Sequence, residues 1–303
     1  MRIFLNGIGA FGLDTLTRLQ AQGDEIVAVA APAQSLSGRA DRLRAHAEAA
    51  GIPAFDPGQL DEPAVLHALS EAAPELGVMA FVQAIVKTAA LELPTHGTIQ
   101  YHPSLLPRHR GRSAINWAII QGEAKTGVSI FWPDSGLDTG PILLQHEVEI
   151  GPGDTAGSLY YDKLYPLGID ALAEAVDLVR RGMAPRTPQD ETSATYERPC
   201  GDRPSRIDWT LPIAEVYDLI RGCDPSPGAW SQWKDQKLRI LDATPLSEQR
   251  AAPGLVVALD DSGLIVGGAD GALLARRLRL DPAPAGPARE VAAEAGIAVG
   301  DEF

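Results

Sequence analysis

The sequence has few cysteines and no long apolar run. Cys200 and Cys223 are its only cysteines, with no CxxC spacing and no cluster with histidine. This excludes a disulfide framework and a structural zinc site of the usual spacing. No stretch reaches the roughly 18 apolar residues that a membrane helix needs. The first residues begin a strand without the regions of a secretory signal, so we expect a cytoplasmic protein with no membrane partner.

Basic residues are also scarce. The chain holds 26 lysines and arginines against 40 aspartates and glutamates, a formal net charge of −14. Residues 203–303 carry 11 basic and 15 acidic side chains, which leaves 15 and 25 for residues 1–202. Neither part is basic, so the long-range field repels phosphate backbones and nucleic acid is not expected as a partner.

The first half of the chain alternates short β-rich runs with helical stretches rich in Ala and Leu, a pattern typical of βαβ units on a parallel sheet. Strands are predicted at 3–6, 26–30, 76–81, 98–101 and 128–132, and helices at 10–21, 39–50, 63–73 and about 154–181. A polar, proline-containing segment at 183–206 then marks a connection.

Beyond this segment, a predicted helix at 213–222 precedes β-rich runs at 255–259, 264–266 and 272–280. Turn signals separate these runs, as in a small barrel. We therefore predict an α/β protein with two domains. Residues 1–190 would form a Rossmann-like, mostly parallel sheet domain, residues 191–206 a linker, and residues 207–303 a small C-terminal, OB-like β-barrel domain.

Residues 7–12, GIGAFG, form a glycine-rich turn between a predicted strand and a predicted helix, where backbone N–H groups can cradle a pyrophosphate. Nicotinamide dinucleotide binding also needs an acidic residue at the end of the second strand. That strand instead ends in the apolar residues 30–32. Close packing of a tight turn is therefore the favoured interpretation, NAD(P) is not expected, and a dinucleotide site remains the alternative.

His102 and Asp138 are the candidate catalytic pair. His102 follows a predicted buried strand and begins a loop with two prolines, which make it rigid. Asp138 follows the strand predicted at 128–132. If these strands are parallel neighbours, both residues lie at the carboxyl edge of the sheet, where open α/β sheets bind ligands. Alone, each residue would be read as structural, but their joint placement suggests acid–base chemistry.

The runs HPSLLPRHRG at 102–111 and SGLDTG at 135–140 resemble the formyltransferase family that uses 10-formyltetrahydrofolate. The likeness spans nearly the whole chain, and the family joins a Rossmann-like domain to a C-terminal barrel. Residues 99–116 and 129–144, with PGAW at 227–230, are most similar to the hydrolase domain of 10-formyltetrahydrofolate dehydrogenases. Methionyl-tRNA formyltransferases are also similar.

The resemblance implies a catalytic set of Gln100, His102 and Asp138. Gln100 departs from the tRNA-directed members, which carry Asn there. The resemblance also implies that the folate is bound by the matching residues of three loops, namely Ala84, Ile85, Val86, Ser104, Leu105, Leu106, Pro107 and Asp134.

The expected activity is formyl transfer from 10-formyltetrahydrofolate, with attack on the formyl carbon by a small-molecule amine or by water. No metal is expected. Formylation of methionyl-tRNA ranks lower, because the chain lacks a positive surface and residues 33–44 form only a short, weakly basic segment. An NAD(P)-dependent oxidoreductase and a non-catalytic folate-binding module are further alternatives. The family's C-terminal domains often self-associate, so a homodimer remains open.

Overall fold

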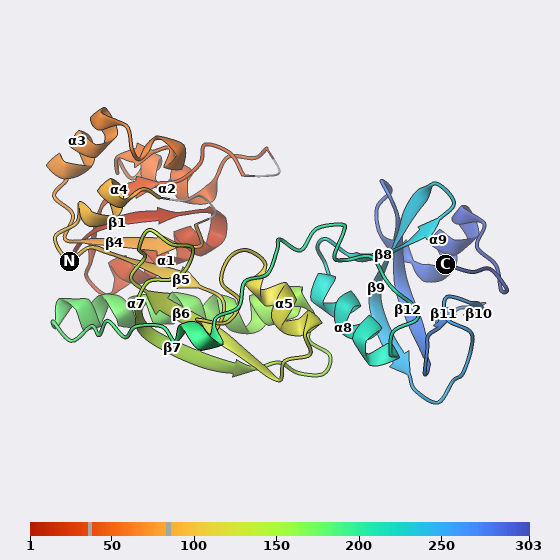
Figure 1. The fold of residues 1–303 in the computed structure, drawn as a ribbon. Helices are drawn as coiled ribbons and strands as arrows, with labels where there is room; N and C mark the ends of the chain where they lie inside the picture. Colours follow the sequence, from red (N-terminus) through yellow and green to blue (C-terminus); the bar gives the residue numbers. More distant parts are fainter. Residues whose placement is uncertain (36–37, 83–85) are drawn as a thin grey trace. The chain divides into compact units, whose positions relative to one another are not determined.

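In the computed structural model, which describes residues 1–35, 38–82 and 86–303, the chain forms two units (Figure 1). The first unit comprises residues 1–111, 127–148 and 162–196, and the second comprises residues 112–126, 149–161 and 197–303. The boundaries predicted above, 1–190, 191–206 and 207–303, stay a prediction. No helix in the described part of the chain is long and apolar enough to span a bilayer.

The first unit is built on a seven-stranded sheet with the strand order β3-β2-β1-β4-β5-β6-β7. Its strands are β1 (Arg2–Gly7), β2 (Glu25–Ala30), β3 (Ala54–Phe55), β4 (Leu76–Ala80), β5 (Thr98–His102), β6 (Lys125–Phe131) and β7 (Ile142–Glu149). Its helices are α1 (Gly9–Ala21), α2 (Arg42–Ala49), α3 (Pro63–Glu71), α4 (Thr88–Glu92) and α7 (Tyr165–Arg180). The strands from β3 to β5 pair in parallel.

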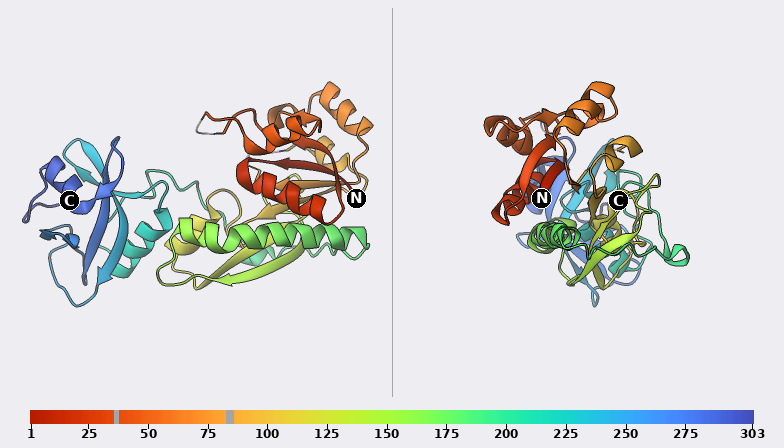
Figure 2. Two further views of the ribbon diagram at one scale, coloured as in Figure 1. Left: turned by 180° about the vertical axis from the view of Figure 1, so that it is seen from behind. Right: turned by 90° about the vertical axis from the view of Figure 1, so that its left-hand side faces the viewer.

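Helices cover both faces of this sheet. Helices α1 and α7 lie side by side on one face, as Figure 2 shows, and Gly168 of α7 closely approaches Tyr101 of β5. On the other face, Phe4 and Ala28 pack in an apolar cluster with residues of the segments around α3 and α4. All five residues of β4 are buried, as expected for a parallel strand covered on both sides.

The glycine-rich turn before α1 serves close packing. A Cβ at Gly7 would lie 2.9 Å from the Ala80 carbonyl oxygen, and one at Gly12 would lie 2.8 Å from Leu43. The N–H of Gly9 donates a 2.7 Å hydrogen bond to the carboxylate of Asp41, which also caps the N-terminus of α2. The Asp41 carboxylate therefore already accepts the hydrogen bond that the N–H of Gly9 would donate to a bound phosphate.

One assumption about the sheet is wrong. Strands β5 and β6 pair antiparallel, with His102 opposite Ser129 and Gln100 opposite Phe131. The carboxyl end of β6 therefore lies at the opposite edge of the sheet from the carboxyl end of β5. Asp138 is not placed near His102 by two parallel strands, which is the arrangement assumed from the sequence. The helix expected at 154–181 is also divided, because a short α6 (Ala156–Ser158) and a π-helical turn at Leu159–Leu164 precede α7.

The second unit holds a six-stranded sheet in the order β10-β11-β12-β9-β8, with β13 paired to β12. All its pairs are antiparallel. Its strands are β8 (Ala229–Trp233), β9 (Gln236–Leu246), β10 (Val256–Asp260), β11 (Gly263–Gly267), β12 (Ala272–Leu280) and β13 (Gly286–Pro287), and its longer helices are α5 (Ala114–Ile120), α8 (Ile213–Cys223) and α9 (Ala288–Ala295). The predicted fold class, a mostly parallel sheet followed by a smaller β domain, is confirmed.

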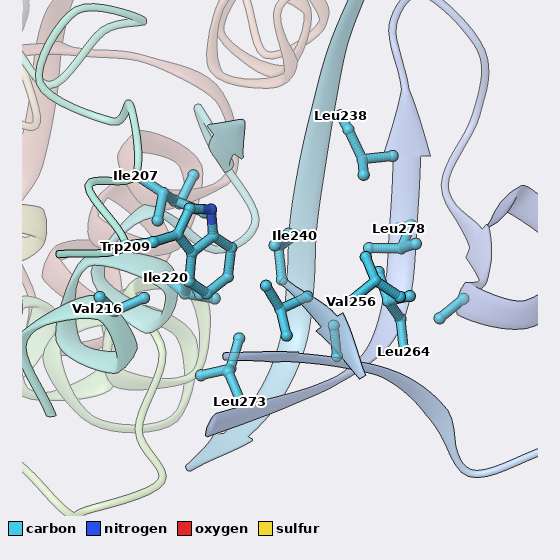
Figure 3. Packing of buried hydrophobic residues seen from close by; sticks show 14 of the residues in the cluster. Ile207, Trp209, Val216, Ile220, Leu238, Ile240, Val256, Leu264, Leu273 and Leu278 are labelled. Carbon is cyan, nitrogen blue, oxygen red and sulfur yellow. The ribbon is translucent and has the colours of Figure 1, made fainter. Parts of the chain in front are cut away.

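The core of the second unit forms between α8 and the antiparallel sheet (Figure 3). Ile213, Val216 and Ile220 recur at helical spacing and turn one apolar face of α8 inward. Leu238 and Ile240 of β9 are wholly buried in the same cluster. Both cysteines of the chain are free thiols.

Replacing Leu238 by Ala should destabilise the protein by about 2–5 kcal/mol, because it removes buried methyl groups and leaves a cavity. Chemical denaturation followed by tryptophan fluorescence measures this loss, since Trp209 lies in the same cluster. Leu211, which is 40% exposed, provides the matched control. An equal loss in Leu211→Ala would contradict the core assignment.

Candidate active site

Gln100, His102 and Asp138 come together over one face of β5. Gln100 and His102 are two residues apart on the strand and so project to the same face. The Nδ1 atom of His102 lies 3.6 Å from Oδ2 of Asp138, and Nε2 of Gln100 lies 3.4 Å from Oδ1 of the same carboxylate. The loop after β6 therefore folds back across β5, and this contact, rather than a shared sheet edge, unites the predicted catalytic residues.

The His102 ring is held from its other side. Its Nε2 lies 2.8 Å from the carbonyl oxygen of His109. A carbonyl oxygen can only accept, so Nε2 carries a hydrogen and donates it. Nδ1 is then the ring atom that faces Asp138. Its 3.6 Å separation from the carboxylate is just beyond hydrogen-bond length.

Asp138 is buried and its backbone is constrained. Its side chain is 7% exposed, and its φ of 55° lies in the left-handed region, which Asp tolerates better than most residues. Oδ2 accepts a 2.7 Å hydrogen bond from the N–H of Gly111. The loop that follows His102 therefore also helps to hold the carboxylate.

The His102 loop rests on Ser129, a buried hydroxyl of β6. Ser129 donates to the carbonyl oxygen of Ser104 at 2.6 Å and accepts the N–H of Leu106 at 3.0 Å. Gln145 of β7 donates to the Ser129 hydroxyl at 2.8 Å and to the Leu106 carbonyl at 2.9 Å. The Ser104 hydroxyl donates to the carbonyl of Arg108. These bonds fix the predicted folate-binding run from Ser104 to Pro107 as a rigid wall.

The remaining predicted binding residues lie in two other places. Asp134 is exposed and stabilises its own loop by accepting hydrogen bonds from the Gly136 N–H and the Thr139 hydroxyl. Val86 is half-buried against α4. Ala84 and Ile85 lie outside the described residues.

Val86 belongs to a tightly packed, mostly apolar region between the sheet and α4 that has no room for a water molecule. This region includes Met79, which pairs in register with Gln100. Two polar residues, Thr98 and Asn6, are part of it, and Asn6 is 2% exposed. Nδ2 of Asn6 has no hydrogen-bond partner among the described residues.

Sequence reasoning missed the residues that hold the two loops from outside. Arg110 is 1% exposed, and its guanidinium donates to Gln189 and Glu191. Gln189 lies in a segment without periodicity, so no pattern indicated a role. Within the part of the chain that the structure describes, no group of three or more His, Cys, Asp or Glu side chains could hold a metal ion.

Replacing Ser129 by Ala should lower the stability by about 1–3 kcal/mol, because it leaves the buried Ser104 carbonyl and Leu106 N–H without their shared partner. Thermal unfolding of the purified variant measures the effect. Ser135→Ala, at an exposed position of the Asp138 loop, should unfold at the wild-type temperature. If both variants unfold alike, the hydroxyl does not support the His102 loop.

Chemically, the candidate site combines an imidazole beside a carboxylate with a side-chain amide donor. The first two groups can move a proton during attack on a carbonyl carbon, and the third can stabilise an oxyanion.

Comparison with known proteins gives two family models that cover most of the chain. The model described as formyl transferase matches residues 2–176, and the model described as formyl transferase, C-terminal domain, matches residues 202–295.

Individual relatives agree with these models. Mitochondrial 10-formyltetrahydrofolate dehydrogenase from Mus musculus is 38% identical over 96% of this chain, which spans 33% of that protein. Methionyl-tRNA formyltransferase from Geobacter metallireducens is 34% identical over 93% of this chain and 91% of that protein. The crystal structure of HypX from Aquifex aeolicus in complex with tetrahydrofolic acid has a TM-score of 0.73 at 21% identity and covers 100% of this chain and 48% of that one. This last likeness shows the fold alone.

Proposed function

Because this chain belongs to the formyl transferase family, we propose that it takes the formyl group from 10-formyltetrahydrofolate and passes it to a small-molecule amine or to water. The observation that carries the proposal is the meeting of His102 and Asp138, 3.6 Å apart, beside Gln100. The chain spans about a third of the length of the dehydrogenase relatives. The proposal concerns formyl chemistry.

The two acceptors use the same chemistry. A nucleophile attacks the formyl carbon, negative charge builds on the formyl oxygen, and the bond to N10 of the folate then breaks. With water, a C–O bond forms, one proton passes from the water to N10, and the products are tetrahydrofolate and formic acid, which releases the second proton to become formate. With an amine, a C–N bond forms instead, and the same proton transfer releases tetrahydrofolate and the formylated amine.

The residues supply this proton transfer and the stabilising donor. Nδ1 of His102 receives or delivers the proton, while the Asp138 carboxylate stabilises the imidazolium and attracts the proton of the nucleophile. The amide of Gln100 carries two hydrogens. One faces Asp138, and the other is available to the formyl oxygen when it becomes an oxyanion. Loss of one such donor typically costs roughly 10²–10³ in rate.

For the folate, we propose the three loops named from the sequence. The run from Ser104 to Pro107 begins two residues after His102, and Val86 packs in the apolar region under α4. Asp134 would act through the conformation of its loop, because its carboxylate is bonded within that loop.

Formylation of methionyl-tRNA is the second candidate. The extent of the match to the Geobacter metallireducens enzyme, 91% of that protein, favours it. The net charge of −14 and the absence of a basic half in the sequence weigh against a tRNA acceptor, because tRNA binding relies on positive charge. A small acceptor therefore ranks first.

A turnover assay distinguishes the acceptors. The purified protein should release tetrahydrofolate from 10-formyltetrahydrofolate slowly with water alone and faster with the right amine. Amino sugars, amino acids and charged tRNA are compared at equal concentration. Folate binding without turnover under every condition would show a binding module and overturn the proposed activity.

Asp138→Asn should lower the turnover rate at least about a hundredfold, because the substitution keeps an oxygen for the Gly111 N–H but removes the charge beside His102. Steady-state release of tetrahydrofolate measures the rate. Asp170→Asn, an exposed position on α7, makes the same chemical change away from the candidate site and should behave as wild type. An unchanged rate in Asp138→Asn would remove this carboxylate from the mechanism.

A further inference from the structure

A polar contact outside the candidate site holds the loop that carries Asp138. The side chain of Gln189 donates from Nε2 to the backbone carbonyl of Asp138 at 2.9 Å and to that of Gly140 at 2.7 Å. Both carbonyls belong to the loop that folds back over β5. Gln189 therefore fixes this loop on the two sides of Thr139, through its backbone rather than through a catalytic side chain.

The same segment also holds the His102 loop. The N–H of Thr195 donates to the Pro107 carbonyl at 3.1 Å, and its hydroxyl accepts the N–H of His109 at 2.8 Å. The carbonyl of His109 in turn accepts the hydrogen bond from the His102 ring. Residues 189–195 thus fasten the loop of the imidazole at one end and the loop of the carboxylate at the other.

Arg110 sets the orientation of the Gln189 amide. The guanidinium donates from Nε and from one terminal nitrogen to Oε1 of Gln189, at 3.1 and 2.8 Å. Because the oxygen of the amide is fixed by these donors, its NH₂ group must point to the Asp138 loop. Further donors of Arg110 bind Glu191 at 2.6 Å and the Tyr196 hydroxyl at 2.6 Å. These partners raise the pKa of Arg110, so the guanidinium keeps its charge.

We propose that Gln189 is a positioning residue for Asp138, and that Arg110 locks it in the orientation this requires. The role rests on the proposed function and deepens it. Asp138 has a left-handed backbone, so rotation of its peptide plane swings the carboxylate relative to Nδ1 of His102. A misplacement of about 1 Å at a reacting group can cost about 10²-fold in rate. Gln189 prevents this rotation without touching the substrate.

The discriminating variant is Gln189→Glu. Glutamate has nearly the shape of glutamine and still accepts the two hydrogen bonds from Arg110, so the buried guanidinium keeps its partners. It has no hydrogen to donate and places negative oxygens against the carbonyls of Asp138 and Gly140. We expect kcat to fall about 10²-fold and KM for the folate to stay near its wild-type value, while the loss of two hydrogen bonds lowers the unfolding temperature. A merely structural role would lower the unfolding temperature in the same way but leave kcat per folded molecule unchanged.

Glu191→Gln is the matched control. It replaces a carboxylate by an amide at the other side chain that binds the Arg110 guanidinium. The Glu191 side chain is 68% exposed and bonds to Arg110 rather than to the Asp138 loop. It should keep the wild-type kcat. The double variant Gln189→Glu with Glu191→Gln leaves Arg110 with one carboxylate and one amide and the net charge unchanged. It should lose as much activity as Gln189→Glu. It replaces Gln189→Glu in the test if the added negative charge of the single variant prevents folding.

Crystal structures of the wild type and of the Gln189→Glu and double variants give a readout that does not depend on turnover. We expect the Asp138 carboxylate to be displaced from Nδ1 of His102 in both variants. Wild-type kcat with an unmoved carboxylate in either variant would overturn the positioning role. If the wild type turns over no formyl donor, the proposed function fails, and the position of Asp138 in the crystals still decides the role of Gln189.

Discussion

The placement of one buried carboxylate is the constraint on which the active-site architecture depends. Asp138 must lie beside the His102 ring although its strand, β6, runs antiparallel to β5 and leads away from the edge where β5 ends. The loop after β6 folds back over the sheet, and the left-handed backbone of Asp138 is part of this fold-back. Together they bring the carboxylate to His102. Such a loop has no sheet ladder of its own, so side chains from other segments must satisfy its backbone groups.

The fold class could be predicted from the sequence because the strands of the first sheet can be recognised from the composition of short segments. The runs that became β1, β2 and β4 are continuous apolar stretches between helical patterns, and their burial on both faces explains that composition. The direction of β6 could not be predicted in this way. A buried strand has the same composition in either direction, and the helix α5 before it is compatible with both.

The candidate site was predictable only in part, for a related reason. His102 and Asp138 stand in distinctive runs between prolines and glycines, and the structure places them 3.6 Å apart. Gln189 lies in an aperiodic stretch that carries no such signal, and Arg110 stands in the same run as His102 without a pattern that marks it as buried. Both are joined to distant parts of the chain by hydrogen bonds between segments about 50 to 80 residues apart, and local sequence patterns do not predict such bonds. The fact that the loops of His102 and Asp138 are both bonded to residues 189–195 can be seen only in the three-dimensional structure.

The hydrogen bond between Gly9 and Asp41 bears on how this scaffold could change in evolution or by engineering. Asp41 is 2% exposed and satisfies N–H groups at the starts of both α1 and α2. It acts as a resident anion in the place where related turns hold a nucleotide. Supplying an acidic residue at the end of β2 would therefore not convert the turn into a nucleotide pocket. The internal carboxylate would first have to be removed, and the N-terminus of α2 would lose its cap with it.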